Sequence, residues 1–168
     1  IFACMLSVSV PTFAESNFNP SINIDLQTRV SYLNDRIDNH IRHDASGFKG
    51  DYFLLSVSGQ VTDCLTYSWR QRINQKKERS DRFDGTDWVY LDYKLDDHWS
   101  VAAGKQVAMV GGYEYDRNPV DIYVSSEFWN NIAPFQFGAS ATYTTTNGKN
   151  RFTAQVTQSL FNTPANRD

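Results

Sequence analysis

The 168-residue sequence has only two cysteines, no excess of positive charge and no long hydrophobic run. Two cysteines cannot build a disulfide-rich scaffold, and neither lies in a Cys/His metal spacing. The formal net charge of −3 argues against a nucleic-acid partner, because domains that bind nucleic acids usually carry an excess of positive charge. Because a membrane-spanning helix needs about 20 consecutive apolar residues, the sequence predicts no such helix. It also has no phosphate-binding loop, dinucleotide fingerprint or nucleophile elbow, so we expect neither an enzyme nor a bound cofactor.

What the sequence does contain is aromatic residues and a two-residue alternation. Phe, Tyr and Trp make up 14% of the chain, too many for a disordered segment. From residue 20 onward, apolar and polar residues alternate in seven stretches, the pattern of strands with one apolar and one polar face. The stretches are 22–32, 53–61, 65–74, 89–95, 99–103, 135–144 and 152–160. Their apolar phase contains no charged residue, and its polar members are Thr28, Gln71 and Gln158.

Alternation alone does not separate a membrane barrel from a soluble sandwich, because both have strands with one apolar face. Three further features favour a barrel. Several stretches have about ten residues or more, enough for a tilted strand to cross a bilayer. Connections alternate between short ones, at 62–64, 96–98 and 145–150, and long ones, at 34–49, 75–87 and 106–134. Aromatic residues gather in two girdles: Tyr67, Tyr93, Trp99, Tyr143 and Phe152 near the short connections, and Tyr32, Phe53 and Phe135 near the long ones.

We therefore predict an all-β fold, an antiparallel transmembrane β-barrel of the porin type. Strands cross a bilayer only as a closed cylinder, since every backbone N–H and C=O must find a partner within the protein. Bacterial barrels generally have an even number of strands, so about seven strands form an incomplete fragment. The alternative is a secreted β-sandwich that binds a ligand or glycan, in which the apolar residues form a core.

The start of the chain differs in character from the rest. Residues 1–14 carry no charge and are typical of a partial signal peptide. Pro11 interrupts the apolar run, and Thr12-Phe13-Ala14 resembles a small-x-small cleavage site. We expect residues 15–168 to form the N-terminal part of an outer-membrane β-barrel.

If the apolar phase faces lipid, the opposite phase lines a water-filled lumen, and its charges bias which ions enter. The charged residues of that phase are Asp25, Arg29, Arg70, Arg72, Asp92, Lys94 and Arg151. Five are positive and two are negative, so the predicted wall is cationic. Arg70 and Arg72 are adjacent inward positions of one strand, where two guanidinium groups suit a carboxylate or a phosphate. The alternative is that both arginines pair with acidic loop residues and stabilise the barrel.

The longest connection, from Val107 to Pro134, is the candidate constriction of the channel. Gly111-Gly112 allows it to fold sharply, and its charged residues are Glu114, Asp116, Arg117, Asp121 and Glu127. Folded inward, its acids would face the basic wall. Folded outward, it would cover the outer surface or contact a neighbouring subunit. Lys105 falls in the apolar phase, so we expect the preceding strand to end or bulge near Gly104.

Several segments resemble a known family. The run GDYFLLSVSG at 50–59, followed by LTYSWRQR at 65–72, is similar to the start of Bacteroidetes porins of the phosphate-selective porin O and P family. WVYLDY at 88–93 and AGKQ at 103–106 resemble the next hairpin of that family.

The resemblance implies a homotrimeric channel in the bacterial outer membrane, surrounded by lipid and lipopolysaccharide, with its third long loop folded into the pore. Small hydrophilic solutes would diffuse through it passively, and anions such as phosphate are candidates. Phosphate selectivity in a few members relies on a dense inward ladder of arginines, which is not evident in this sequence.

Overall fold

The computed structural model describes residues 20–74, 83, 85–115, 117, 121–122 and 124–161. The expected signal peptide and Asp116 of the candidate constriction lie outside these residues. The strands are β1 (Ser21–Leu33), β2 (Arg36–Ile37), β3 (His40–Ile41), β4 (Gly47–Gln60), β5 (Leu65–Arg72), β6 (Thr86–Lys94), β7 (Trp99–Val107), β8 (Phe135–Thr144) and β9 (Arg151–Thr157). One short helix, α1 (Glu127–Asn130), was not expected from the alternation. No helix in the described part of the chain has the length and apolar character needed to cross a membrane.

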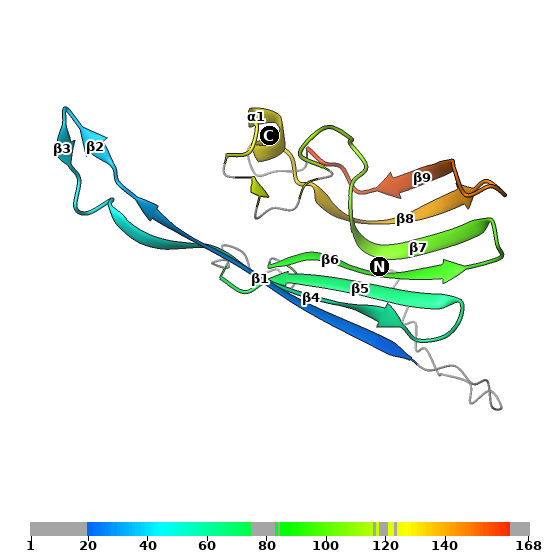
Figure 1. Cartoon of the computed structure of the whole chain (residues 1–168). Helices are drawn as coiled ribbons and strands as arrows, with labels where there is room; N and C mark the ends of the chain where they lie inside the picture. The colour runs from blue at the N-terminus through cyan, green and yellow to red at the C-terminus, as the bar shows by residue number, and fades with distance from the viewer. Residues whose placement is uncertain are drawn as a thin grey trace, which may run out of the picture.

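Seven of the strands form one curved antiparallel sheet in the order β1-β4-β5-β6-β7-β8-β9 (Figure 1). Each of the seven predicted stretches is one of these strands, which confirms the all-β antiparallel fold. Strands that follow one another in the chain are neighbours in the sheet, apart from the small β2–β3 hairpin between β1 and β4. Because β1 and β9 form its two edges, the described sheet is an open section of wall.

Short and long connections alternate along this sheet, as predicted. The short ones are 61–64, 95–98 and 145–150, and the long ones are 34–46, 73–85 and 108–134. The turn from β8 to β9 requires Gly148, whose φ of 67° is left-handed and whose N–H donates to the Thr145 carbonyl at 2.7 Å. Since the strands are antiparallel, all short turns lie at one end of the sheet and all long connections at the other.

The strands β1 and β4 extend beyond the rest of the sheet as an arm (Figure 1). They have 13 and 14 residues, and β4 pairs with β5 only from Leu54 onward. At the tip, Asp38 (φ 48°) and Asn39 (φ 64°) form the two-residue turn between β2 and β3. Positive φ at both central residues is the geometry of a type I′ turn, which suits the twist of a hairpin.

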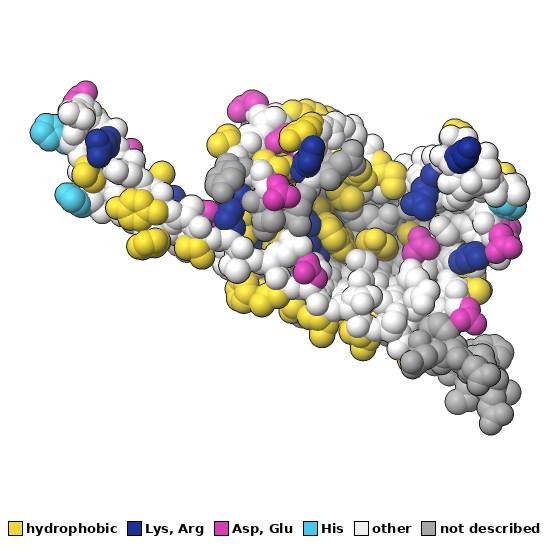
Figure 2. All heavy atoms as spheres, viewed as in Figure 1, with side chains coloured by type: hydrophobic (Ala, Val, Ile, Leu, Met, Phe, Trp, Pro, Cys, Tyr) yellow, Lys and Arg dark blue, Asp and Glu magenta, His cyan; other side chains and the backbone are white. Residues whose placement is uncertain are grey.

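The two faces of the sheet differ in exposure as well as in polarity. Apolar-phase side chains are open to the surroundings, with Ile24 70% and Val156 78% exposed. On the opposite face Arg70, Gln106 and Ser140 are all at most 9% exposed. Figure 2 shows hydrophobic side chains along the lower margin of the sheet, from the arm to its body. A sandwich would cover this face with a second layer, whereas an extended uncovered apolar surface is what a lipid-facing wall presents.

Aromatic side chains lie at both ends of the apolar face. Trp99, Tyr143 and Phe152 are direct cross-strand neighbours at the short-turn end, and the Trp99 and Tyr143 ring centroids are 5.1 Å apart. At the other end, the rings of Tyr32 and Phe48 meet edge to face at 5.2 Å. Such rings suit the two boundaries between hydrocarbon and water.

The strand β7 does not end or bulge near Gly104, so the expectation based on Lys105 is wrong. It continues to Val107, paired without a register shift to both β6 and β8. The Lys105 ammonium donates to the backbone carbonyls of Phe83 at 3.0 Å and Thr86 at 2.7 Å. Because a long methylene stem carries the charge, a lysine on an apolar face can reach polar groups near the end of the sheet.

The turn between β6 and β7 is held by the Asp96 carboxylate. Its Oδ1 accepts hydrogen bonds from the N–H of His98 at 2.7 Å and of Trp99 at 2.8 Å. The hydrogen bond from the His98 N–H, and to a smaller extent that from the Trp99 N–H, holds the pKa of the Asp96 carboxyl below its ordinary value. The ionised carboxylate is therefore the form that stabilises this turn.

Asp96→Ala is expected to lower the unfolding temperature of the protein at neutral pH. Because the folded-state pKa lies below the unfolded value of about 3.9, the stabilisation is present above that pH and disappears as the pH falls through the folded pKa. The variant should therefore differ from the wild type at pH 7 and approach it in strong acid. Circular dichroism during heating in detergent measures this difference.

Asp63→Ala, in the β4–β5 turn, is the matched control for that experiment. Within the described residues, no hydrogen bond to the Asp63 carboxylate is seen, so its loss should leave the unfolding temperature unchanged. An Asp96→Ala effect of equal size at pH 7 and in strong acid would show that the carboxylate does not act through these bonds.

Candidate functional site

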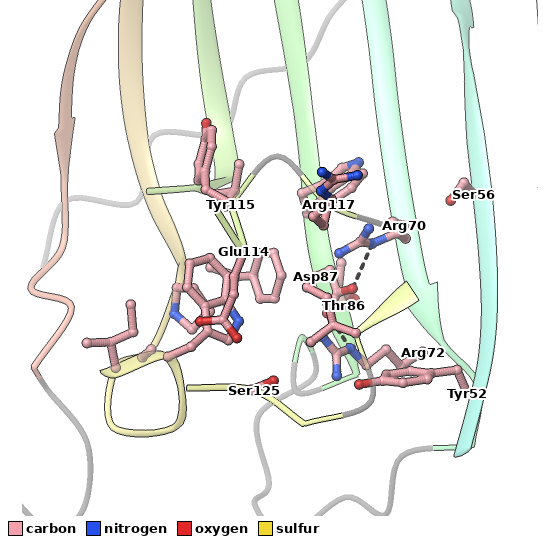
Figure 3. Close-up of a pocket in the computed structure, with 18 of the residues that line it drawn as sticks. Tyr52, Ser56, Arg70, Arg72, Thr86, Asp87, Glu114, Tyr115, Arg117 and Ser125 are labelled. Atoms are coloured by element: carbon pink, nitrogen blue, oxygen red, sulfur yellow. Dashed lines mark hydrogen bonds and ion pairs between the residues drawn. The ribbon is translucent and has the colours of Figure 1, made fainter. Parts of the chain in front are cut away.

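The 108–134 loop folds over the polar face of the sheet. Gly111 (φ 69°) and Gly112 (φ 93°) have left-handed backbones that reverse the chain direction near its start. On the opposite side, Arg29 of β1 donates through Nη1 to the carbonyl of Ile122 in the loop at 2.8 Å. A cavity of about 990 Å³ lies between the loop and the wall, lined by residues of β1, β4, β5, β6, β7, β8 and the loop (Figure 3).

Within the loop, Glu114 and Ser126 hold distant segments together. The Ser126 N–H donates to Glu114 Oε1 at 2.7 Å, and the Ser126 hydroxyl donates to the other carboxylate oxygen. The same hydroxyl accepts from the Trp129 N–H at 3.2 Å and caps α1. Trp129 therefore lines the cavity from an anchored turn. Glu114 lies across the cavity from Arg70 and Arg72 (Figure 3).

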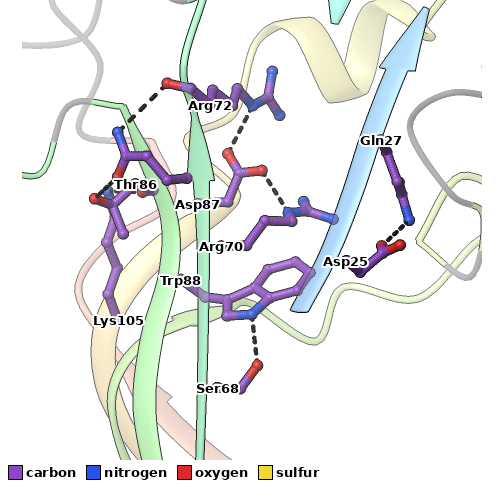
Figure 4. A network of polar contacts seen from close by, with 10 residues as sticks. Asp25, Gln27, Ser68, Arg70, Arg72, Thr86, Asp87, Trp88 and Lys105 are labelled. Carbon is purple, nitrogen blue, oxygen red and sulfur yellow. Dashed lines mark hydrogen bonds and ion pairs between the residues drawn. The ribbon is translucent and has the colours of Figure 1, made fainter. Parts of the chain in front are cut away.

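The centre of the opposite wall is an ion-pair cluster of Arg70, Asp87 and Arg72 (Figure 4). The Nε atoms of Arg70 and Arg72 donate to the two oxygens of Asp87, each at 2.7 Å. The side chains of Arg70, Asp87 and Arg72 are 11%, 5% and 27% exposed. A β-bulge in the pairing of β5 with β6 lies between Arg70 and Gln71 and brings Asp87 to the inner face. A carboxylate this buried is stable as an anion only when it is fully paired.

Aromatic rings fix the planes of the two guanidinium groups. The Cζ of Arg70 lies 3.6 Å from the ring centroid of Trp88, within the range of a cation–π contact. The ring of Phe135 lies 5.6 Å from the Cζ of Arg70, and that of Tyr52 lies 5.8 Å from the Cζ of Arg72. Phe135 therefore faces the charged cavity, and its predicted place in the outer aromatic girdle is wrong. It stands at the first position of β8, where the strand alternation begins.

The terminal nitrogens of both arginines remain open to the cavity. Asp87 uses only the Nε atoms, and within the described residues no hydrogen bond from the Nη atoms of Arg70 or Arg72 is seen. Both residues line the cavity. The sequence offered two alternatives, an anion-binding pair or a pair neutralised by acids. The structure has features of both alternatives. Asp87 pairs with the Nε atoms of both arginines, while their terminal nitrogens face the cavity.

Of the remaining predicted wall residues, Asp25 lines the cavity, and Arg29 lies near the cluster, with its Cζ 4.6 Å from the Tyr52 ring that Arg72 also approaches. The other three lie away from it. Asp92 lies opposite Thr66, four residues from Arg70 along β5, or about 13 Å. Lys94 ends β6 and pairs with Asp97 at 2.8 Å, and Arg151 begins β9 at the short-turn end. The inward charges thus form two groups, one under the loop and one at the short turns.

The predicted constriction residues are only partly brought together. Glu114 and Arg117 line the cavity, and the Arg117 guanidinium lies over the Tyr113 ring at 4.6 Å. Asp121 lies on another surface of the loop and does not line the cavity. Glu127 is exposed on α1, where its carboxylate accepts from the Asn131 side chain at 3.0 Å.

Two acids that sequence reasoning missed change the charge of the wall. Asp87 was assigned to a connection, and Asp51, which pairs with Arg29 at 3.2 Å, was not assigned to a face. Both stand at bulges, Asp51 at the register shift between Arg29 and Val30. When Asp51 and Asp87 are added to the seven charged residues predicted for the polar face, that face has five positive and four negative charges. Its excess of positive charge is therefore one unit, where the sequence indicated three.

An antiparallel sheet with an uncovered apolar face, and a charged opposite face covered by a long loop, is the wall of a porin-type channel. The model of the family "phosphate-selective porin O and P" matches residues 22–168, and the chain belongs to this family. Porins are channels rather than enzymes. Comparison with curated proteins and with solved structures found no match.

Proposed function

We propose that this protein is an outer-membrane porin whose water-filled channel lets small hydrophilic solutes diffuse passively, with anions such as phosphate favoured. Residues 15–168 would supply the N-terminal part of the barrel, after removal of a signal peptide at 1–14. The complete barrel would work as a homotrimer surrounded by lipid and lipopolysaccharide.

The observation that carries this proposal is the open edge of the Arg70–Arg72 pair. Two guanidinium groups, held in place by Asp87 and by aromatic rings, present their terminal nitrogens to the cavity beneath the loop. Guanidinium edges bind carboxylate and phosphate oxygens in pairs. Fixed charges at a narrow point of a pore bias which ions enter.

The reversal potential across a planar bilayer under a salt gradient tests this function on the full-length protein. We expect the wild-type channel to prefer anions. The double variant Arg70→Gln with Arg72→Gln keeps an amide donor for Asp87 but removes two positive charges. The ratio of anion to cation permeability should then fall severalfold, because anions lose the attraction of two fixed positive charges in the cavity.

The double variant Lys94→Gln with Arg151→Gln is the charge-matched control. It also removes two positive charges from the wall, but at the exposed short-turn end, where salt screens them over about 8 Å. Its permeability ratio should stay close to that of the wild type. Cation preference in the wild type, or equal shifts in the two double variants, would contradict the assigned role of Arg70 and Arg72.

A further inference from the structure

The cavity beneath the loop has features that a channel for simple inorganic anions does not need. Charged groups of both signs line it, together with five aromatic side chains, those of Tyr52, Trp88, Tyr115, Trp129 and Phe135. An inorganic anion has no apolar surface to place against a ring. The composition of the cavity therefore indicates a solute that has both a charge and an apolar face.

The cavity presents positive and negative groups in equal number. Among its described lining residues the cations of the polar face and the loop are Arg70, Arg72 and Arg117, and the anions are Asp25, Asp87 and Glu114. Lys105 also borders the cavity, but its ammonium is bound to the Phe83 and Thr86 carbonyls. A doubly charged phosphate would be attracted by the guanidinium edges but repelled by the carboxylates of Asp25 and Glu114.

Those same carboxylates are acceptors for hydroxyl groups. Ionised Asp and Glu side chains accept hydrogen bonds and do not donate them. Asp25 accepts from the Gln27 amide at 2.6 Å through Oδ2, and Glu114 accepts from Ser126. Each carboxylate retains lone pairs toward solvent, so a solute with several hydroxyl donors would find partners beside the guanidinium edges.

Trp129 is the ring available to such a solute. Trp88 and Tyr52 already have an arginine over one face, at 3.6 Å for Arg70 on Trp88 and 4.6 Å for Arg29 on Tyr52. In the described part of the chain, no aromatic or cationic side chain contacts the Trp129 ring. Its backbone is anchored by the cap of α1.

We propose that this cavity is a binding subsite for a sugar acid with one carboxylate, such as a hexuronate. The carboxylate binds the Nη edges of Arg70 and Arg72, the hydroxyls donate to Asp25 and Glu114, and the C–H face of the sugar ring lies on Trp129. The partly positive C–H groups of a pyranose are attracted to the negative face of an aromatic ring. This inference rests on the proposed porin function, and it names the preferred class of solute.

Block of the ion current through the full-length channel in planar bilayers tests the subsite. D-glucuronate, inorganic phosphate and glucose are added in turn, and the concentration of each that halves the chloride current is measured. We expect glucuronate to act at a concentration about tenfold lower than phosphate or glucose. Equal block by phosphate would overturn the ring contact, and equal block by glucose would overturn the role of the carboxylate.

Trp129→Ala should raise the half-blocking concentration of glucuronate about tenfold and leave that of phosphate unchanged, and Trp129→Phe should restore part of the loss. Phe128→Ala is the matched control, since this neighbouring ring of α1 is 54% exposed and does not line the cavity. Equal effects of the Trp129 and Phe128 variants would overturn the proposal.

Channels that prefer anions but bind glucuronate no better than phosphate would refute the subsite alone, whereas absence of channels would refute both proposals.

Discussion

Asp87→Asn is expected to destabilise the barrel by about 3–5 kcal/mol, the usual cost of removing one partner from a buried ion pair. Asp87 is the common partner of Arg70 and Arg72, and its side chain is 5% exposed. An asparagine has one acceptor oxygen, so one guanidinium would face an amide donor instead of an acceptor. The two arginines, adjacent on the same face of β5, would then repel each other without a counter-charge.

The measurement is the temperature at which the detergent-solubilised protein loses its folded mobility on a gel. Asp97→Asn is the control, because Asp97 is paired with Lys94 at 2.8 Å but its side chain is 90% exposed, and surface pairs contribute little. Asp87→Asn should also increase anion preference in the bilayer, since the cluster gains one unit of positive charge. An unchanged unfolding temperature would show that Asp87 does not hold the arginines together.

The strands were predictable because, in a strand with one apolar and one polar face, apolar and polar residues alternate along the sequence. Each of the seven stretches became a strand of the sheet, and the alternation of short and long connections followed. The inward positions of Arg70 and Arg72 also follow from this parity. None of these inferences required knowledge of contacts between distant residues.

The central acid of the site was not predictable in the same way. A β-bulge adds one residue to a strand, so that beyond it the odd and even positions exchange faces. No residue type in the sequence marks where such a bulge occurs. Asp87 lies at such a point, and so does Asp51, the partner of Arg29. Contacts such as that of Arg29 with the Ile122 carbonyl, 93 residues apart, depend on how the loop folds back, which alternation does not encode.

Leu91→Arg tests which face of the sheet meets lipid, and we expect it to cost about 2–4 kcal/mol of folding free energy in lipid vesicles. Leu91 lies near the middle of β6 on the apolar face and is 43% exposed, opposite Ala103 at the centre of β7. Its other partner, Tyr67, therefore lies deeper than the row of Trp99 and Tyr143, four residues along β7 from Ala103. An arginine there would place a charge in the hydrocarbon layer. Titration with denaturant, followed by tryptophan fluorescence, measures the free energy.

Two controls separate a lipid-facing residue from a core residue of a sandwich. Thr66→Arg places the same charge on the polar face, opposite Asp92, and should cost little. Leu95→Arg lies in the same phase as Leu91 but in the short turn, where the cost of an arginine at a membrane boundary falls to about 0–1 kcal/mol. In a protein core, the cost would follow the packing around each leucine instead of its distance from the bilayer centre. A large cost at Leu91 with little at Leu95 and Thr66 is therefore the signature of a strand whose apolar side is solvated by acyl chains.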